Sequence, residues 1–139
     1  MSLLIGPTDD IAGCLELRRV VFMLEQGVSE EEERDGCDDS AHHILARLDG
    51  QPVGCARILI EGDKGKIGRV CVLADQRGTG LGKALIEGCL AHLTSLGLTR
   101  AVLGAQTHAL GFYEALGFTA FGEEFDDAGI PHRMMERGL

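Results

Sequence analysis

A chain of 139 residues, 45% of them hydrophobic and 25% charged, has the size and composition of one globular domain. The net charge of −9 argues against a nucleic-acid partner, because binding to phosphates requires a basic surface. Residues 1–7 are too short and uncharged for a signal peptide, and no apolar run approaches the roughly 18 residues of a membrane-spanning helix. We therefore expect one domain over residues 1–139, in a cytoplasmic protein with no membrane partner.

The first third of the chain predicts a strand, a helix and an acidic segment. Residues 3–5 form the strand, and Thr8, Asp9 and Asp10 offer N-caps for the helix. Its apolar face comprises positions 11, 14, 15, 21 and 22, and the helix leads into segment 21–27. Acidic residues then crowd positions 30–39. This segment is either an exposed acidic loop or helical turn, or part of it borders a binding site.

Three strands follow, over residues 42–48, 52–60 and 66–73. Asp49-Gly50 between the first two is a strong hairpin signal, and Gly62 to Gly65 makes the second turn. Arg57 and Arg69 lie in these strands, where a buried arginine requires a partner. Each of the two arginines either pairs with the acidic segment or faces a carboxylate on a ligand.

The last part of the chain predicts two helices and three strands. A helix from about Gly80 carries Leu81, Leu85, Cys89, Leu93 and Leu96 at near-helical spacing and ends at Gly97. Residues 100–105 form a strand, residues 108–116 a short helix, and residues 118–124 and 132–136 the closing strands. Hairpins that precede a β-α-β crossover predict a sheet with both antiparallel and parallel pairing.

The stretch 68–85 carries the clearest functional signal, because it combines a buried strand, a glycine-rich turn and a helix N-terminus. Gly78, Gly80 and Gly82 alternate between Arg77 and Lys83, and without Cβ atoms they let backbone N–H groups approach a ligand. The helix adds its dipole and its unpaired N–H groups. Together these features predict an anion site, most naturally for phosphate.

The spacing of this turn excludes two common phosphate motifs. A P-loop would require glycine at Arg77 and a hydroxyl side chain at Ala84. A dinucleotide fingerprint would require Gly-x-Gly-x-x-Gly, and the run from Gly78 to Gly82 is one residue too short.

The pattern that fits is Arg77-x-x-Gly80-x-Gly82, which resembles the pyrophosphate loop of the GNAT acetyltransferases. Phe112-Tyr113-x-x-x-Gly117-Phe118 is similar to another segment of that family. Segments 21–27, 104–109 and 129–132 resemble its ElaA-type branch, and the likeness extends over essentially the whole chain. It implies an α/β (α+β) GNAT fold: a central mixed, mostly antiparallel, twisted sheet of about six to seven strands with helices on both faces.

The resemblance also implies which residues bind acetyl-CoA. The pyrophosphate loop would hold the diphosphate, and the strand before it would offer backbone groups to the pantetheine arm. Gln106 stands where many members carry an asparagine that contacts CoA, and the extra methylene still permits that hydrogen bond. The implied donor-binding residues are Val70, Cys71, Val72, Arg77, Gly78, Thr79, Gly80, Leu81, Gly82, Lys83, Gln106 and Phe112.

Acetyl transfer further needs an acid for the leaving thiolate and a base for the amine. Tyr113, the only tyrosine, is the acid that the resemblance implies; the alternative is a core aromatic residue. The candidate bases are Glu25 and His132, with Glu123 and His108 as further candidates, although His108 could instead cap the helix it begins. We expect segments 22–26, 106–108 and 130–132 to meet at the acceptor site, with Phe22, Gln26 and His108 binding the acceptor.

The resulting hypothesis is an N-acetyltransferase that transfers acetyl from acetyl-CoA to a primary amine of a small molecule or peptide, by direct attack in a ternary complex. The alternatives are a non-catalytic acyl-CoA sensor and, more remotely, a binder of another phosphate ligand. No metal is expected, because His42-His43 lacks a third ligand at metal spacing. The five cysteines form no C-x-x-C pair and are expected to be reduced. The protein is expected to be a monomer or homodimer.

Overall fold

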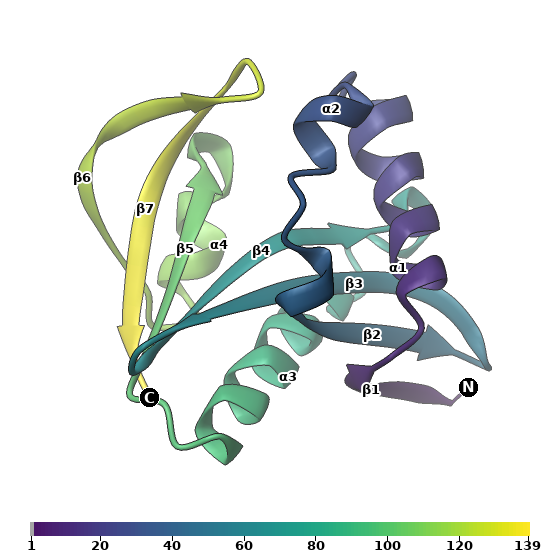
Figure 1. Ribbon diagram of the computed structural model, residues 1–139, viewed down its shortest axis with the longest axis horizontal. Coiled ribbons are helices and arrows are strands. Elements are labelled where there is room, and N and C mark those ends of the chain that lie inside the picture. The colour runs from purple at the N-terminus through teal and green to yellow at the C-terminus, as the bar shows by residue number, and fades with distance from the viewer. Residues whose placement is uncertain (1) are drawn as a thin grey trace.

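The computed structural model describes residues 2–139 and contains one seven-stranded sheet with the order β1-β2-β3-β4-β5-β7-β6 (Figure 1). Its strands are β1 (Leu3–Thr8), β2 (His42–Leu48), β3 (Gln51–Glu61), β4 (Lys64–Val72), β5 (Arg100–Gln106), β6 (Thr119–Asp127) and β7 (Ile130–Gly138). Only β4 and β5 pair in parallel. The predicted mixed, mostly antiparallel sheet is therefore confirmed. Along residues 2–139, no helix is both long and apolar enough to cross a membrane.

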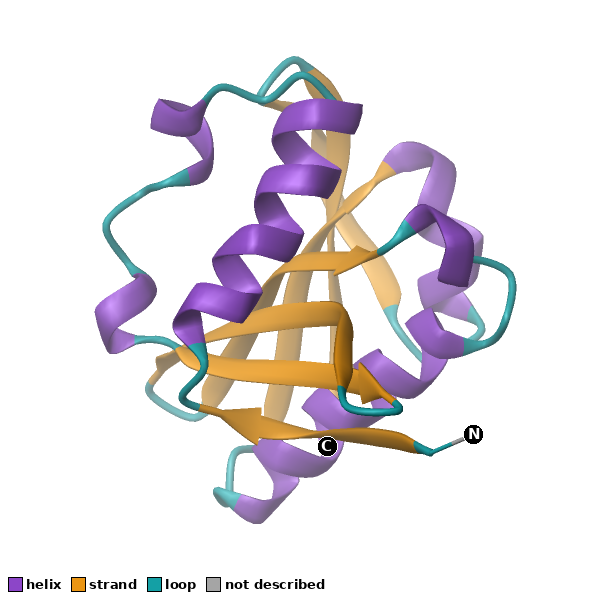
Figure 2. Cartoon of the chain, turned by 90° about the vertical axis from the view of Figure 1, so that its right-hand side faces the viewer, coloured by secondary structure: helices purple, strands orange, loops and turns teal. Residues whose placement is uncertain are grey.

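Helices cover both faces of this sheet, as predicted (Figure 2). One face carries α1 (Ile11–Arg18), and the other carries α3 (Leu81–Ser95) with α4 (Leu110–Glu114). The remaining helical pieces are α2 (Glu30–Glu33), the π-helix η1 (Arg19–Glu25) and the 3₁₀ turns η2 (Asp38–Ser40), η3 (Ala74–Gln76) and η4 (Thr107–Ala109). Asp10 caps α1 by accepting from the Gly13 N–H at 3.0 Å.

Strand alternation divides the buried side chains into two cores. Ile44 and Ala46 pack toward α3, whereas Leu45 between them packs toward α1. The larger core includes the predicted α3 stripe except Leu96, which caps the helix and is 43% exposed. Four of the five cysteines are buried, as expected of core residues, and Cys37 is half-buried.

The first helix differs from its prediction, because its continuation is π-helical. The apolar period predicts one helix through segment 21–27, but i→i+4 bonding gives way to the wider η1 at Arg19. The Gln26 N–H donates to Val21 O at 3.2 Å, and the Val28 N–H donates to Phe22 O at 2.9 Å. A π-turn and an α-turn present nearly the same apolar pattern, so the choice between them falls to tertiary contacts.

The two parallel strands separate soon after they meet. β4 and β5 pair only from Lys64↔Arg100 to Ile67↔Leu103, and the rest of each strand diverges (Figure 1). A register irregularity against β3 coincides with Arg69, whose φ of 50° is left-handed. The sheet therefore opens between residues 68–72 of β4 and residues 104–106 of β5.

The acidic segment is partly buried and bound to arginines. Glu33 is 3% exposed and accepts from the Arg18 side chain, which also donates to Asp38 at 2.7 Å. Arg57 donates to both carboxylate oxygens of Asp35 at 2.8 Å. The expectation of an exposed loop is therefore wrong for Glu33, because the buried Arg18 requires a counter-charge. Of the two alternatives for Arg57, pairing with the acidic segment is confirmed.

Arg69 pairs with the same segment and completes this ionic network. Its Nε and Nη2 donate to the backbone carbonyl of Glu33 at 3.3 and 3.2 Å, and its Nη2 also lies 3.3 Å from Asp35 Oδ2. The hydrogen bonds from Arg57 hold the pKa of Asp35 well below its ordinary value, so this carboxylate stays charged. The network fixes α2 and the loop after it against β3 and β4.

Arg18→Met should destabilise the fold strongly, because it leaves Glu33 buried without its counter-charge. We expect a loss of about 3–5 kcal/mol in the free energy of unfolding, measured by urea denaturation followed by circular dichroism. The neighbouring Arg19 makes only an exposed ion pair with Glu16, so Arg19→Met is the matched control and should cost about 1 kcal/mol or less. Equal losses in the two variants would contradict the structural role of the network.

Candidate functional site

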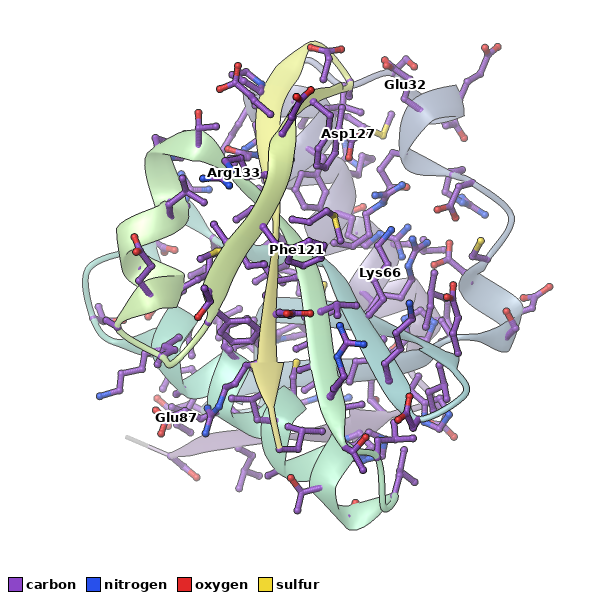
Figure 3. All side chains as sticks on the ribbon, turned by 90° about the vertical axis from the view of Figure 1, so that its left-hand side faces the viewer. Glu32, Lys66, Glu87, Phe121, Asp127 and Arg133 are labelled. Carbon is purple, nitrogen blue, oxygen red and sulfur yellow. The ribbon has the colours of Figure 1, made fainter. Side chains whose placement is uncertain are left out.

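The opening between β4 and β5 holds a cavity of about 830 Å³. Its walls come from η1, α2, both diverging strands and the β6–β7 hairpin. Figure 3 shows two of its lining residues, Glu32 of α2 and Asp127 of β6, at the same end of the molecule. Cavity residues that sequence analysis proposed for a site are Phe22, Gln26, Arg57, Arg69, Val70, Cys71, Val72, Arg77, Gln106, His108, Tyr113 and His132.

The three segments expected at an acceptor site do meet in this cavity. Phe22 and Gln26 come from the first segment, Gln106 and His108 from the second, and Ile130 and His132 from the third. The Gln106 amide donates to Gln26 Oε1 at 3.4 Å, and its own Oε1 lies 2.7 Å from His108 Nε2. His108 therefore pairs with Gln106 and caps neither η4, in which it lies, nor α4, because neither start has a side-chain cap.

His132 has a fixed orientation on β7. It lies opposite Gln106 in the β5–β7 register, is 9% exposed and stacks on Phe125 with a centroid separation of 5.7 Å. Its Nδ1 lies 2.7 Å from the backbone oxygen of Ile130. Because a carbonyl oxygen only accepts, Nδ1 carries the hydrogen of this bond. In the neutral ring this leaves Nε2 with a lone pair, as a general base requires.

Tyr113 borders the cavity from α4. Its ring packs edge-on against Phe112 and Phe118, at centroid separations of 5.0 and 5.9 Å. Burial, together with the nearby Cys89, raises the pKa of Tyr113 to about 12. The phenol therefore remains protonated through the neutral range and can act as a proton donor. Since Tyr113 also packs against the larger core, both its predicted roles are compatible with this position.

The glycine turn lies beyond β4, next to the cavity. The backbone N–H groups of residues 78–83 donate to no acceptor within residues 2–139, and the first bond of α3 runs from Ala84 N to Gly80 O at 3.1 Å. Gly78 and Gly80 have φ values of 78° and 86°, a region that strongly favours glycine. Six consecutive free donors at the N-terminus of a fifteen-residue helix suit an oxyanion ligand.

For several predicted donor-binding residues, the side chain is buried or already engaged, so only the backbone is free to contact a ligand. Cys71 is 3% exposed and its Sγ lies 3.5 Å from Cys55 Sγ under α1, so only its backbone can reach a ligand. The Thr79 hydroxyl donates to Gln76 O at 2.6 Å, and the Leu81 side chain is buried. Phe112 lies outside the cavity lining, and a Cβ on Gly82 would come within 3.5 Å of its ring.

Glu25 is placed differently from the base it was predicted to be. Its Oε2 lies 2.8 Å from Arg77 Nη2, and Glu25 is not among the residues that line the cavity. Its carboxylate therefore faces Arg77 and not the cavity. Glu123, the other carboxylate candidate, is also outside the lining and lies on the exposed β6.

Sequence analysis missed part of the cavity wall. Lys66 and Leu59 lie opposite each other on β4 and β3, and both line the cavity, as do Phe125 and Met134. These residues occupy ordinary strand positions, so no local signal distinguishes them. Alternation along β4 is interrupted at Arg69, so Lys66 could not be assigned to the face of Val70 from the sequence.

Comparisons with known proteins agree with this geometry. The family model described as acetyltransferase (GNAT) domain matches residues 14–139. The uncharacterized protein YyaT of Bacillus subtilis (strain 168) is 40% identical over 133 residues, covering 94% of this chain and 90% of that protein.

Two solved structures are also similar. An acyl-CoA N-acyltransferase from Pseudomonas aeruginosa has a TM-score of 0.85 and 33% identity, covering 98% of each chain. Escherichia coli ElaA has a TM-score of 0.84 and 31% identity, again with 98% of each chain covered.

The sequence predicts that this turn binds the diphosphate of coenzyme A. Gly80→Val should then remove that binding, because the valine side chain enters the space in front of the free N–H groups and its φ is strained. In the wild type, coenzyme A at 100 times its Kd should add about 2.7 kcal/mol of stability, seen as a higher Tm. In Gly80→Val this shift should disappear.

Gly97→Val is the matched control for that variant. Gly97 has a similar φ of 78° and equally open surroundings, but it follows the opposite end of α3. Both variants should lower the basal Tm through backbone strain, and only Gly97→Val should keep the response to coenzyme A. A full response in a folded Gly80→Val would exclude this turn as the diphosphate site.

Proposed function

Because the chain belongs to the acetyltransferase (GNAT) domain family, we propose that it transfers the acetyl group of acetyl-CoA to a primary amine, by direct attack in a ternary complex. The observation that carries this proposal is the cavity at the β4–β5 opening. A proton donor and a fixed imidazole border this cavity, and the free N–H groups of residues 78–83 lie just beyond it.

The donor would bind from the glycine turn toward the cavity. Residues 78–83 would hold the diphosphate through their N–H groups, with the Lys83 ammonium nearby in sequence. Beyond Ile67, the side of β4 that faces the opening has no strand partner, so it can offer backbone groups to the pantetheine arm. A backbone N–H near Val70 would then polarise the thioester carbonyl, a contact that can contribute a few kcal/mol.

His132 is the base that we propose for the amine. An alkylamine with a pKa near ~10.4 is neutral in only about one molecule in a thousand at pH 7. The bond from Nδ1 to the Ile130 carbonyl aligns the ring, and Nε2 would take the ammonium proton directly or through one water. Glu25 is the weaker candidate, because it pairs with Arg77 and does not line the cavity.

Tyr113 is the proposed acid for the leaving group. The neutral amine nitrogen attacks the carbonyl carbon, and the nitrogen of the tetrahedral intermediate releases its extra proton to water. The carbon–sulfur bond then breaks as the intermediate collapses to the neutral amide and the thiolate. The coenzyme A thiolate then takes the phenolic proton of Tyr113, and solvent reprotonates the phenolate. Burial raises the pKa of Tyr113 to about 12, so the phenol is protonated at neutral pH and its transfer of a proton to the thiolate depends on direct contact with the sulfur.

The acceptor would be the amine of a small molecule or peptide that enters beside η1. Phe22 offers an apolar surface, while Gln26, Gln106 and His108 form a hydrogen-bonded chain that can orient a polar group. The proposal is tested by coenzyme A thiol release from acetyl-CoA with a panel of amines, polyamines, amino acids and peptides. Release that depends on one class supports it. Tight coenzyme A binding without turnover on any of them would favour the acyl-CoA sensor.

Tyr113→Phe should lower kcat at least about tenfold, because it removes the proton donor and keeps the aromatic packing. Coenzyme A affinity should be almost unchanged when measured by titration calorimetry. The comparison requires conditions in which the chemical step limits turnover. An unchanged kcat there would leave Tyr113 as a core residue.

His132→Gln should lower kcat/KM for the acceptor about a hundredfold at neutral pH, within the range of general-base catalysis. The defect should shrink as pH rises toward the pKa of the amine, because the acceptor then arrives neutral. His92→Gln is a suitable control, since His92 lies on α3 and pairs with His42 away from the cavity. A pH-independent defect would indicate that His132 is structural.

A further inference from the structure

One ion pair joins the donor loop to the acceptor wall. Arg77 directly precedes the free N–H groups of residues 78–83, and its Nε donates to Val72 O at the end of β4 at 3.1 Å. Its Nη2 lies 2.8 Å from Oε2 of Glu25, the last residue of η1. The same guanidinium is thus connected to the strand end, to the glycine turn and to the π-helix.

The local sequence of η1 does not favour a π-helix over an α-helix, so contacts with distant segments must stabilise the π-helical form. Helices of this kind are rare and are often found at functional sites. The end of η1 has two side-chain contacts to distant segments, Glu25 with Arg77 and Gln26 with Gln106. Phe22 and Gln26, which line the cavity, belong to this short stretch. The shape of the acceptor wall therefore depends on where Arg77 lies.

The Arg77 guanidinium can hold Glu25 and a phosphate at once. Arginine has five N–H donors in a planar fork. Its hydrogen bond to Val72 uses Nε and its ion pair with Glu25 involves Nη2, while Nη1 donates to no acceptor within residues 2–139. A diphosphate on the adjacent turn can bind the remaining donors without breaking the pair. The Arg77 side chain is half exposed, so a bound diphosphate would restrict its motion.

We propose that Arg77 and Glu25 form a positioning pair that couples donor binding to the order of the acceptor wall. The diphosphate of coenzyme A restrains the guanidinium, and Glu25 passes this restraint to the end of η1, where Phe22 and Gln26 face the acceptor. Glu25 acts through Arg77 and touches neither substrate. This inference rests on the proposed function, because it takes coenzyme A as the ligand of residues 78–83.

Hydrogen exchange measured by mass spectrometry tests the coupling with coenzyme A as the probe. In the wild type, saturating coenzyme A should slow amide exchange at residues 78–83 and also, by about two- to fivefold, at residues 19–28. In Glu25→Gln the slowing at residues 78–83 should persist, and the slowing at residues 19–28 should be lost. A purely structural role of Glu25 would instead raise exchange at residues 19–28 equally with and without coenzyme A.

Glu16→Gln is the matched control for that variant. It breaks the exposed Arg19–Glu16 ion pair at the other end of η1, which has no contact with Arg77, and should keep the wild-type response. A wild type without slowing at residues 19–28, or a Glu25→Gln protein that responds like the wild type, would overturn the coupling alone. If coenzyme A leaves residues 78–83 unchanged as well, the donor site itself is overturned, and the coupling with it.

Discussion

The separation of β4 from β5 is the constraint on which the rest of the structure depends. These strands pair over four residues each and then diverge, so the sheet opens at the one parallel junction within residues 2–139. Unpaired backbone along a strand must find another partner, and here it faces a cavity of about 830 Å³. The opening also brings the end of β4 and its glycine turn beside the cavity, on the side opposite the β6–β7 hairpin. Each residue proposed for catalysis faces this one space.

The two helical walls of the cavity are held in different ways. Arg18 fixes α2 and the loop after it to α1, and Arg57 and Arg69 fix the same segment to β3 and β4. Each arginine has acidic partners, and Arg18 and Arg57 are deeply buried. Separating one of these ion pairs would leave an unpaired charge buried in a low dielectric, which is costly, so this wall resists movement. η1 has a half-exposed ion pair and one long hydrogen bond instead. The wall formed by η1, which borders the proposed acceptor site, is therefore easier to move than the wall formed by α2.

The two proposed catalytic groups differ in how the fold holds them: His132 is oriented by neighbouring groups, and Tyr113 is buried. The His132 ring is aligned by a backbone carbonyl and a stacked phenylalanine, which suits a group that must present one nitrogen reproducibly. Tyr113 owes its raised pKa mainly to burial, so the packing that makes it resemble a core residue also keeps its proton in place. Structural and catalytic interpretations of Tyr113 thus describe the same environment, and kinetics separates them.

The sequence determined every feature that depends on near neighbours along the chain. Asp49-Gly50 sets the β2–β3 hairpin through positive φ values at both residues, and the strand, glycine turn and helix around residues 68–85 required no distant contact to be recognised. Alternation in β2 and the leucine stripe of α3 placed most of the core. Segments 22–26, 106–108 and 130–132 were expected together, and they line one cavity.

Tertiary structure decided what depends on distant partners. The π-form of η1, the burial of Glu33 and the pairing of Glu25 with Arg77 each require a residue from another element, and none leaves a trace in local periodicity. The acidic run 30–33 looks solvated in sequence, because charge patterns do not reveal that Arg18 is buried beneath it. Helical period and turn chemistry are set within a few residues, whereas ion pairing and strand separation are set by the whole sheet.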